Sequence, residues 1–179
     1  MTITYRTYME KIPKKFRKLE GSCLTRPAGG LWGCRGDEWK EACDKGIVDR
    51  DNEIYPRERL KQCFEWKLQE GSKVYKIMSK NSFLKLVKNY HRPVKGLVYE
   101  IDYLRLSEDY DAVEVYEKAL KELGNGLDPS DFPDSWSLNL TYLYPVFILA
   151  QIGLIGWDVP SICVLNTEKV EVIRKIKGE

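Results

Sequence analysis

Three short segments of this sequence combine side chains that could bind a phosphorylated sugar and act on it. One segment offers a cation, since a guanidinium pairs with phosphate through two parallel hydrogen bonds. Another offers an indole among glycines, where a flat ring can stack and the backbone can be approached closely. The third offers a carboxylate, which stabilises positive charge on a sugar. The segments are Tyr5-Arg6-Thr7, residues 27–34 with Gly30, Leu31, Trp32 and Gly33, and residues 156–161 with Asp158; Arg26 is a second candidate cation.

Most familiar catalytic motifs are missing from the sequence. There is no GxGxxG, no GxxxxGK[ST], no HExxH and no GxSxG. The one histidine, His91, stands beside Arg92-Pro93 at an expected helix end, where capping or solvent exposure suits it better than catalysis. A Ser-His or Cys-His hydrolase is therefore disfavoured. The five cysteines form no CxxC pair, so the sequence predicts no metal site.

In their order along the chain, the three segments resemble the ADP-ribosyltransferase superfamily, the NAD-consuming fold of many bacterial toxins and phage-conflict or defence effectors. Enzymes of that superfamily place an Arg or His on the first strand and an aromatic or Ser-Thr-Ser element on the second. An acidic residue stands at the entry to a later strand. Arg6, the GGLWG segment and Asp158 follow this order, and DYDAVEV at 109–115 is similar to an interior strand of such domains. The short motifs are scattered over most of the chain, and none is specific alone.

The resemblance implies that NAD is the substrate and that its ADP-ribose passes to a macromolecular acceptor, either protein or nucleic acid. Cleavage of the nicotinamide–ribose bond leaves positive charge on the sugar, which Asp158 would stabilise. The two arginines would pair with the phosphates, and the segment around the indole would frame nicotinamide. The residues implied in NAD binding are Arg6, Arg26, Gly30, Leu31, Trp32 and Gly33.

One departure from the superfamily pattern concerns the catalytic acid. The usual residue is a glutamate, and Asp158 is shorter by one methylene, which puts its reach to a ribose hydroxyl in question. Glu168 and Glu171 are candidate substitutes, but both follow the strand instead of preceding it. An inactive relative or an altered reaction is therefore an alternative to the usual transfer.

Each chemical candidate also has a structural role open to it. Arg6 can pair with an acid on a neighbouring strand, Trp32 can anchor the core beneath a turn, and Asp158 can cap the turn at Val159-Pro160. Ser161 carries a hydroxyl but suits the start of a strand. If the structural roles hold, the rival function is a non-catalytic interaction module, such as an immunity or adaptor protein that grips a partner with the GGLWG turn.

Composition places the chain among ordinary globular proteins. Hydrophobic residues make up 43% and charged residues 31% of 179, which predicts a single domain over 1–179. The net charge of +2 gives no general attraction to nucleic acid or membrane, and the basic run at 11–18 is typical of a solvated face. The apolar stretch 142–157 is shorter than the roughly 20 residues that cross a bilayer. Without a signal-peptide pattern, we expect a cytoplasmic protein with reduced thiols.

The hydrophobic pattern predicts the elements that must position these residues. The turn signal at 70–72 predicts that the strands on either side of it form a hairpin. With the resemblance, the elements predict an α+β fold with a split, mostly antiparallel sheet core flanked by short helices, and residues 124–137 predict a loop or insertion. Strands are expected at 3–8, 31–34, 63–68, 73–78, 111–115, 161–165 and 170–176, and helices at 37–43, 81–90, 101–106 and 117–123.

Overall fold

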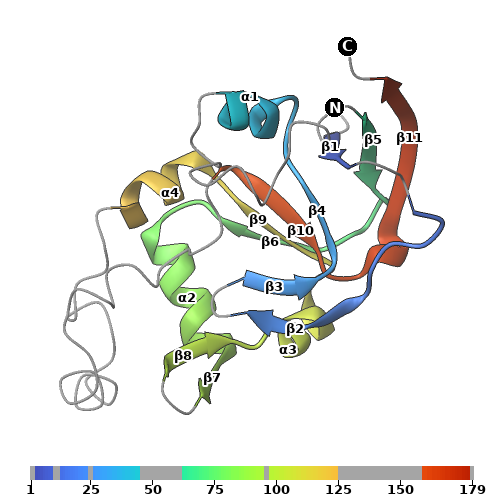
Figure 1. The fold of residues 1–179 in the computed structure, drawn as a ribbon. Coiled ribbons are helices and arrows are strands. Elements are labelled where there is room, and N and C mark those ends of the chain that lie inside the picture. Colours follow the sequence, from blue (N-terminus) through green and yellow to red (C-terminus); the bar gives the residue numbers. More distant parts are fainter. Residues whose placement is uncertain are drawn as a thin grey trace.

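The computed structural model describes residues 3–9, 13–23, 26–44, 62–94, 97–124 and 159–177. Within these ranges the secondary structure is mixed α+β, with several antiparallel sheets and short helices (Figure 1). This confirms the α+β class that the sequence predicts. Beyond Gly124, the predicted loop at 124–137 lies outside the described residues, as does the apolar stretch 142–157.

One sheet has three antiparallel strands and joins the first described strand to the last. β5 lies between β1 and β11, so residues from both ends of the chain are held on one central strand (Figure 1). A register shift between Val172 and Arg174 interrupts the pairing of β11 with β5. The strands are β1 (Tyr5–Tyr8), β5 (Gln62–Leu68) and β11 (Val170–Lys177).

The second sheet has four strands in the order β4-β10-β9-β6. Its pairs are antiparallel except for β6 and β9, which run parallel. The predicted hairpin of β5 and β6 is wrong, because the two strands belong to different sheets. The chain crosses between the sheets here, and the backbone N–H of Asp111 donates to the carbonyl of Lys73 at 2.8 Å. The strands are β4 (Leu31–Gly33), β6 (Val74–Ile77), β9 (Ala112–Val115) and β10 (Ser161–Val164).

Two hairpins that the sequence did not predict complete the described strands. They are β2 (Leu19–Cys23) with β3 (Arg26–Gly29) and β7 (His91–Val94) with β8 (Leu97–Ile101). The predicted turn between β3 and β4 is present. Gly29 and Gly30 adopt φ values of 87° and 73°, which glycine reaches without a steric penalty. This bend lets the chain leave the β2–β3 hairpin and enter the four-stranded sheet.

Within the described ranges, four short α-helices and one 3-10 turn connect the strands. α2 begins with a capping box in which Ser79 caps the helix and Ser82 bonds back to it. His91 follows α2, and its Nδ1 lies 3.1 Å from the Val87 carbonyl oxygen, in agreement with a capping role. The helices are α1 (Glu38–Asp44), α2 (Lys80–Tyr90), α3 (Tyr103–Asp109) and α4 (Glu117–Gly124), with the 3-10 turn at Thr167–Lys169.

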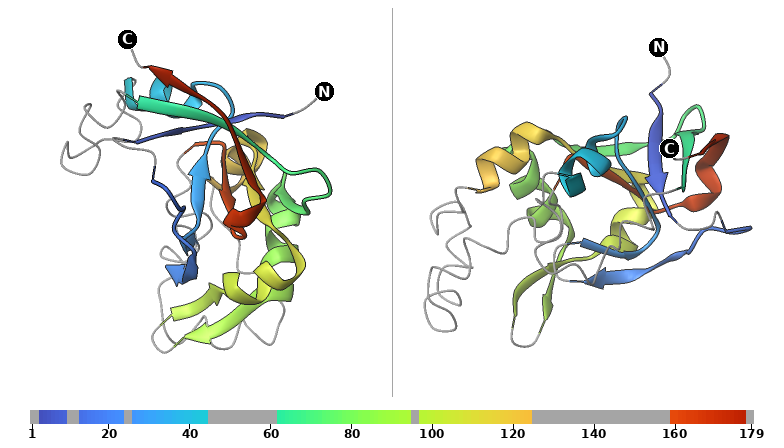
Figure 2. Two further views of the ribbon diagram at one scale, coloured as in Figure 1. Left: turned by 90° about the vertical axis from the view of Figure 1, so that its right-hand side faces the viewer. Right: turned by 45° about the horizontal axis from the view of Figure 1, so that its top comes forward.

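Side-chain alternation along the four-stranded sheet divides the core into two clusters. One face carries Val113, Cys163 and Ile77 and packs against α2, α3 and α4. The other face carries Ile162 and Val164 and packs against aromatic residues of the three-stranded sheet. The molecule is therefore layered as helices, four-stranded sheet and three-stranded sheet, as the two views of Figure 2 show. The aromatic residues of the second cluster are Tyr5, Phe64 and Trp66.

Three further predictions concern the surface and the thiols. In the described part of the basic run, Lys14, Lys15 and Lys18 are exposed, while Phe16 stacks on Phe64 with ring centroids 5.6 Å apart. Among the described ranges, no helix has the length and apolar character that a bilayer crossing requires. The four cysteines whose side chains are described, Cys34, Cys43, Cys63 and Cys163, form no disulfide bond.

Candidate functional site

Two buried polar side chains, Glu114 and Ser161, lie at one end of the four-stranded sheet. Because β10 is antiparallel to both β4 and β9, the C-terminal ends of β4 and β9 lie beside the start of β10 at this end of the sheet. The turn after β4, residues 34–37, then leads into α1, and Tyr116 leads from β9 into α4. Strand direction alone therefore brings together three segments that are far apart in the sequence.

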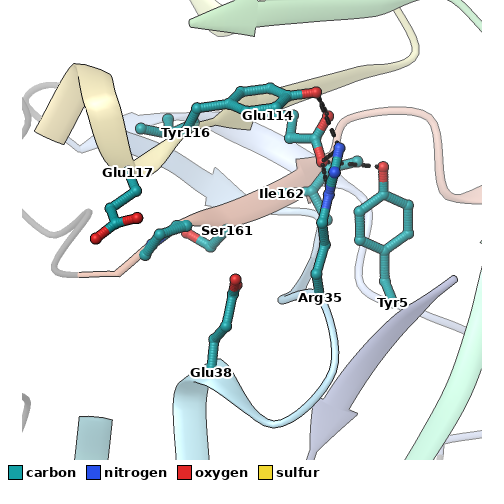
Figure 3. Close-up of a pocket in the computed structure, with 10 residues that line it drawn as sticks. Tyr5, Arg35, Glu38, Glu114, Tyr116, Glu117, Ser161 and Ile162 are labelled. Atoms are coloured by element: carbon teal, nitrogen blue, oxygen red, sulfur yellow. Dashed lines mark hydrogen bonds and ion pairs between the residues drawn. The ribbon is translucent and has the colours of Figure 1, made fainter. Parts of the chain in front are cut away.

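A cavity of about 140 Å³ lies at this edge, open on one side (Figure 3). A cavity of about 150 Å³ accommodates benzene, so this one has room for a single ring of about that size. Three of its lining residues are glutamates and one is an arginine, which makes the wall both polar and charged. The lining residues are Tyr5, Arg35, Glu38, Glu114, Val115, Tyr116, Glu117, Pro160, Ser161 and Ile162.

Glu114 is the buried anchor of the cavity wall. Its side chain is 5% exposed, and Oε1 accepts hydrogen bonds from Nη2 of Arg35 at 2.7 Å and Nε of Arg35 at 2.9 Å. The hydroxyl of Tyr5 donates to the same oxygen at 3.1 Å. Burial, with the nearby Glu114 carboxylate, raises the pKa of Tyr5 above its ordinary value, which keeps this hydroxyl protonated. The carboxylate is thus fully provided with donors.

Tyr116 completes the network around Glu114. Its hydroxyl donates to Oε2 of Glu114 at 2.8 Å and accepts from Nη2 of Arg35 at 2.9 Å. The Arg35 guanidinium also lies over the Tyr116 ring, 5.0 Å from the centroid, which is within the range of a cation–π contact. Arg35 is held by two partners on or beside β9, and in the described residues its Nη1 has no partner.

Glu38 differs from Glu114 because one of its two carboxyl oxygens has no donor among the described residues. It comes from the first turn of α1 and points into the cavity (Figure 3). Its Oε2 is buried and has no hydrogen-bond partner in the described part of the chain. Burial raises the pKa of Glu38, an effect that Arg35 opposes and that Glu117 and Glu41 increase. A carboxyl group of this kind binds and releases a proton nearer to neutral pH than an ordinary one.

Glu117 and Ser161 line the remaining wall. Glu117 lies at the start of α4 and pairs with Lys121, with 2.6 Å between its Oε1 and Nζ. Ser161 is buried at the start of β10, and its hydroxyl donates to the Val159 carbonyl oxygen at 3.0 Å. The Ser161 hydroxyl is therefore engaged in a local backbone contact, which agrees with the strand-start role considered from the sequence.

Arg6, the first cation selected from the sequence, pairs with an acid. Its Nη1 donates to Oδ1 of Asp37 at 2.6 Å, and the Tyr8 hydroxyl donates to the same oxygen. Arg6 lies on β1, and its backbone bridges to Cys34. Arg26 is exposed at the start of β3, the end of that strand farther from β4. The structure does not bring these two arginines together.

The GGLWG residues pack into the protein on both faces of the sheet. Trp32 packs against the helix-side cluster and Leu31 is buried in the other cluster. A Cβ at Gly33 would lie 2.7 Å from Cζ2 of Trp66, and one at Gly30 would lie 2.6 Å from the Val164 carbonyl oxygen. These two glycines accommodate protein atoms, and none of the four residues lines the cavity.

The candidate acids fall in different places. Asp158 lies outside the described residues, whereas Pro160, two residues later, lines the cavity. Glu171 lies on β11 and pairs with Lys67, with 3.2 Å between Oε1 and Nζ. Glu168 is exposed in the 3-10 turn after β10. Because the cavity lies at the start of β10 and this turn follows the end of that strand, Glu168 is not part of the cavity.

The charged residues of the cavity were missed by the sequence analysis, although Tyr5, Pro160 and Ser161 belong to two of the segments that it selected. Glu114 carried a usable signal, because a charged residue inside the strand AVEV, flanked by buried neighbours, needs a buried partner. Arg35 and Glu38 carried none, since charged residues in a turn and a first helical turn are ordinary. Within the described ranges, no group of three His, Cys, Asp or Glu side chains is arranged to hold a metal ion.

Comparison with known proteins adds no relative. No protein-family model matches the chain, and no curated protein or solved structure matches it either. The functional interpretation therefore rests on the residues themselves.

Proposed function

We propose that this chain is an ADP-ribosyltransferase-like enzyme that binds NAD at the sheet-end cavity and transfers its ADP-ribose to a macromolecular acceptor. The observation that carries the proposal is Glu38, which lines a ring-sized cavity beside a guanidinium and has one buried carboxyl oxygen without a hydrogen-bond partner among the described residues. The division of the strands into a three-stranded and a four-stranded sheet agrees with the split sheet of that superfamily. A toxin or phage-conflict role belongs to the same proposal and rests on the sequence resemblance alone.

In the proposed reaction, the bond between ribose C1′ and the nicotinamide nitrogen breaks, and its electron pair goes to that nitrogen. Nicotinamide leaves as a neutral molecule and the sugar keeps the positive charge. A hydroxyl, an amine or water attacks C1′ and passes the proton that it loses to Glu38. The raised pKa of Glu38 suits this step, because a base works best when its pKa lies near the working pH.

The other cavity residues contribute charge and shape. Glu114 is committed to Arg35 and two tyrosines, so its proposed part is to add negative field near the sugar cation and hold Arg35 in place. Nη1 of Arg35 is available to bind a phosphate. We assign the phosphate-binding role to Arg35 instead of Arg6, because Arg6 is paired with Asp37. Asp158 keeps its predicted role as the carboxylate that stabilises the sugar cation, since Pro160, two residues later, lines the cavity.

The direct test is nicotinamide release from NAD by the purified chain, followed by chromatography. Glu38→Gln keeps the size of the side chain and removes the base, so we expect kcat to fall by about 100-fold or more. Asp158→Ala should lower kcat in the same assay. Glu20→Gln, in an exposed pair with Arg17, is the matched control and should leave turnover unchanged.

Two results would speak against the enzyme. Absence of nicotinamide release by the unmodified chain, together with no change of Tm in millimolar NAD, would reject NAD as its substrate. The rival interaction module, which uses the GGLWG turn to grip a partner, would then be the better explanation. Equal turnover by Glu38→Gln and the unmodified chain would show that the reaction does not take place at this cavity.

A further inference from the structure

We infer that Asp37 is a positioning residue, which fixes the start of α1 through Arg6 and Tyr8 and thereby holds Arg35 and Glu38 at the cavity. The catalytic part of this inference rests on the function proposed above. The geometric part does not, because it concerns only where the two cavity side chains are held. Asp37 itself does not line the cavity.

α1 is a short helix that spans Glu38–Asp44. Among its described side chains Ala42 is buried, and Trp39 and Cys43 are half-buried. Helices this short are unstable alone and depend on tertiary contacts. The polar contacts of the preceding turn are among the tertiary contacts that place the first residue of α1, Glu38.

The contact of Asp37 with β1 supplies such a fixed point. Oδ1 of Asp37 accepts from Nη1 of Arg6 at 2.6 Å and from the Tyr8 hydroxyl. Hydrogen bonds from Tyr8 and Arg6 lower the pKa of Asp37, so the carboxylate is ionised near neutral pH. The backbone of Arg6 is itself paired with Cys34, with 2.7 Å from the Arg6 nitrogen to the Cys34 carbonyl oxygen.

Residues 35 and 37 reach to different sheets. Arg35 bonds to Glu114 of the four-stranded sheet, whereas Asp37 bonds to β1 of the three-stranded sheet. Gly36 between them has a φ of 54°, a backbone conformation that side chains other than glycine seldom adopt. The conformation of a turn centred on this glycine is fixed only when the residues on both sides of it have fixed contacts. Loss of the Asp37 contact leaves one of these two residues without its contact, and Glu38 directly follows that residue.

The test compares Asp37→Asn with Asp37→Glu, which keeps the charge. The first readout is the pKa of Glu38, measured by NMR on chain labelled at the glutamate δ-carbon, with Glu38→Gln to assign the signal. The groups that face Glu38 are Arg35, Glu117 and Glu41, and they are retained in both variants. We expect the pKa of Glu38 to fall toward the ordinary glutamate value in Asp37→Asn and to stay raised in Asp37→Glu.

The second readout is nicotinamide release from NAD. A misplacement of about 1 Å can cost about 100-fold in rate, so kcat should fall by about 10- to 100-fold in Asp37→Asn and recover in Asp37→Glu. Asp109→Asn is the matched control, because Asp109 also accepts from a tyrosine hydroxyl, that of Tyr90, at 2.7 Å. It should change neither the pKa of Glu38 nor kcat.

The outcomes separate this inference from the proposed function. If the unmodified chain releases no nicotinamide but the pKa of Glu38 falls both in Asp37→Asn and in Tyr8→Phe, which removes a hydrogen bond to Asp37 but no charge, the proposed function fails and the positioning stands. A folded Asp37→Asn with unchanged pKa of Glu38 overturns the positioning, even if its Tm is lower. If Asp37→Asn does not fold, Tyr8→Phe removes one of the two donors to Asp37 and is judged by the same two readouts.

Discussion

Nη2 of Arg35 lies 2.7 Å from Oε1 of Glu114, and this ion pair joins the turn after β4 to the middle of β9. Glu114 is almost completely buried, whereas the Arg35 side chain is 41% exposed and can reach water. The acidic partner of the pair is thus buried in the fold, and the basic partner is accessible to solvent. This asymmetry determines what each substitution around the cavity should do.

Replacement of Glu114 by glutamine should destabilise the fold. Glu114→Gln keeps the shape but leaves Arg35, Tyr5 and Tyr116 with a poorer acceptor, so we expect a loss of about 1–3 kcal/mol in the free energy of unfolding. Urea denaturation at pH 7 measures this. Glu20→Gln, from an exposed pair, should change the same quantity by less than about 0.5 kcal/mol. Equal losses in the two variants would contradict the network around Glu114.

The packing of β4 against the three-stranded sheet should not tolerate a methyl group at Gly33. A Cβ there would lie 2.7 Å from Trp66, whose side chain is completely buried and cannot move away. We expect Gly33→Ala to lower the free energy of unfolding by about 1–3 kcal/mol in urea denaturation. Gly71→Asn, at an open turn with positive φ, should cost about 1 kcal/mol or less. A stable Gly33→Ala variant would show that the two sheets are less tightly packed than described.

The stability effect of Glu38 should depend on pH with a defined sign. Burial raises its pKa in the folded chain, so the fold favours the neutral form. The contribution of neutral Glu38 to the stability of the fold is fully present below the pKa of about 4.3 that a glutamate has in the unfolded chain. This contribution is lost as the pH rises through the pKa of Glu38 in the folded chain. Glutamine cannot ionise, so Glu38→Gln should be more stable than the unmodified chain at pH 8 and equally stable at pH 4. Thermal unfolding at both pH values checks this, and a pH-independent difference would contradict it.

The buried thiols should react slowly. Burial raises the pKa of Cys34 to about 11, and Cys63 and Cys163 are also buried with raised pKa values. In a chain with Cys23→Ser and Cys43→Ser, we expect these three thiols to react with an aromatic disulfide reagent only after denaturation, because the thiolate is the reactive form. Rapid reaction of the folded chain at pH 8 would show that one of the three is accessible.

The sequence predicted those elements whose signals are local. β9 and α4 lie within a residue of their expected bounds, because the apolar run after Asp111 and the stop at Gly124 need no distant partner. The hairpins β2–β3 and β7–β8 were missed because glycine or proline interrupts the alternation of their strands. The turn at Gly71 indicated a change of direction but not which strand would pair next.

The candidate site was harder to predict because its residues acquire their properties from one another. The raised pKa of Glu38 arises from burial in a wall that includes Glu117 and Ile162, which are distant in sequence. Arg6 shows the converse, since its type suggested phosphate binding while the structure gives it Asp37 as a partner. Of the acids selected from the sequence, Asp158 lies outside the described residues, so its role stays a prediction.

The residues of the cavity wall are far apart in the sequence, and this has a consequence for a chain that is still being translated. The hydroxyl of Tyr5 bonds to Glu114, 109 residues later, and the wall also needs β10, which follows later still. Contacts between such distant residues form late and slowly in folding. A ribosome must therefore have translated nearly all of the described residues before the cavity can form, and a chain that terminates before β10 would lack part of the cavity wall.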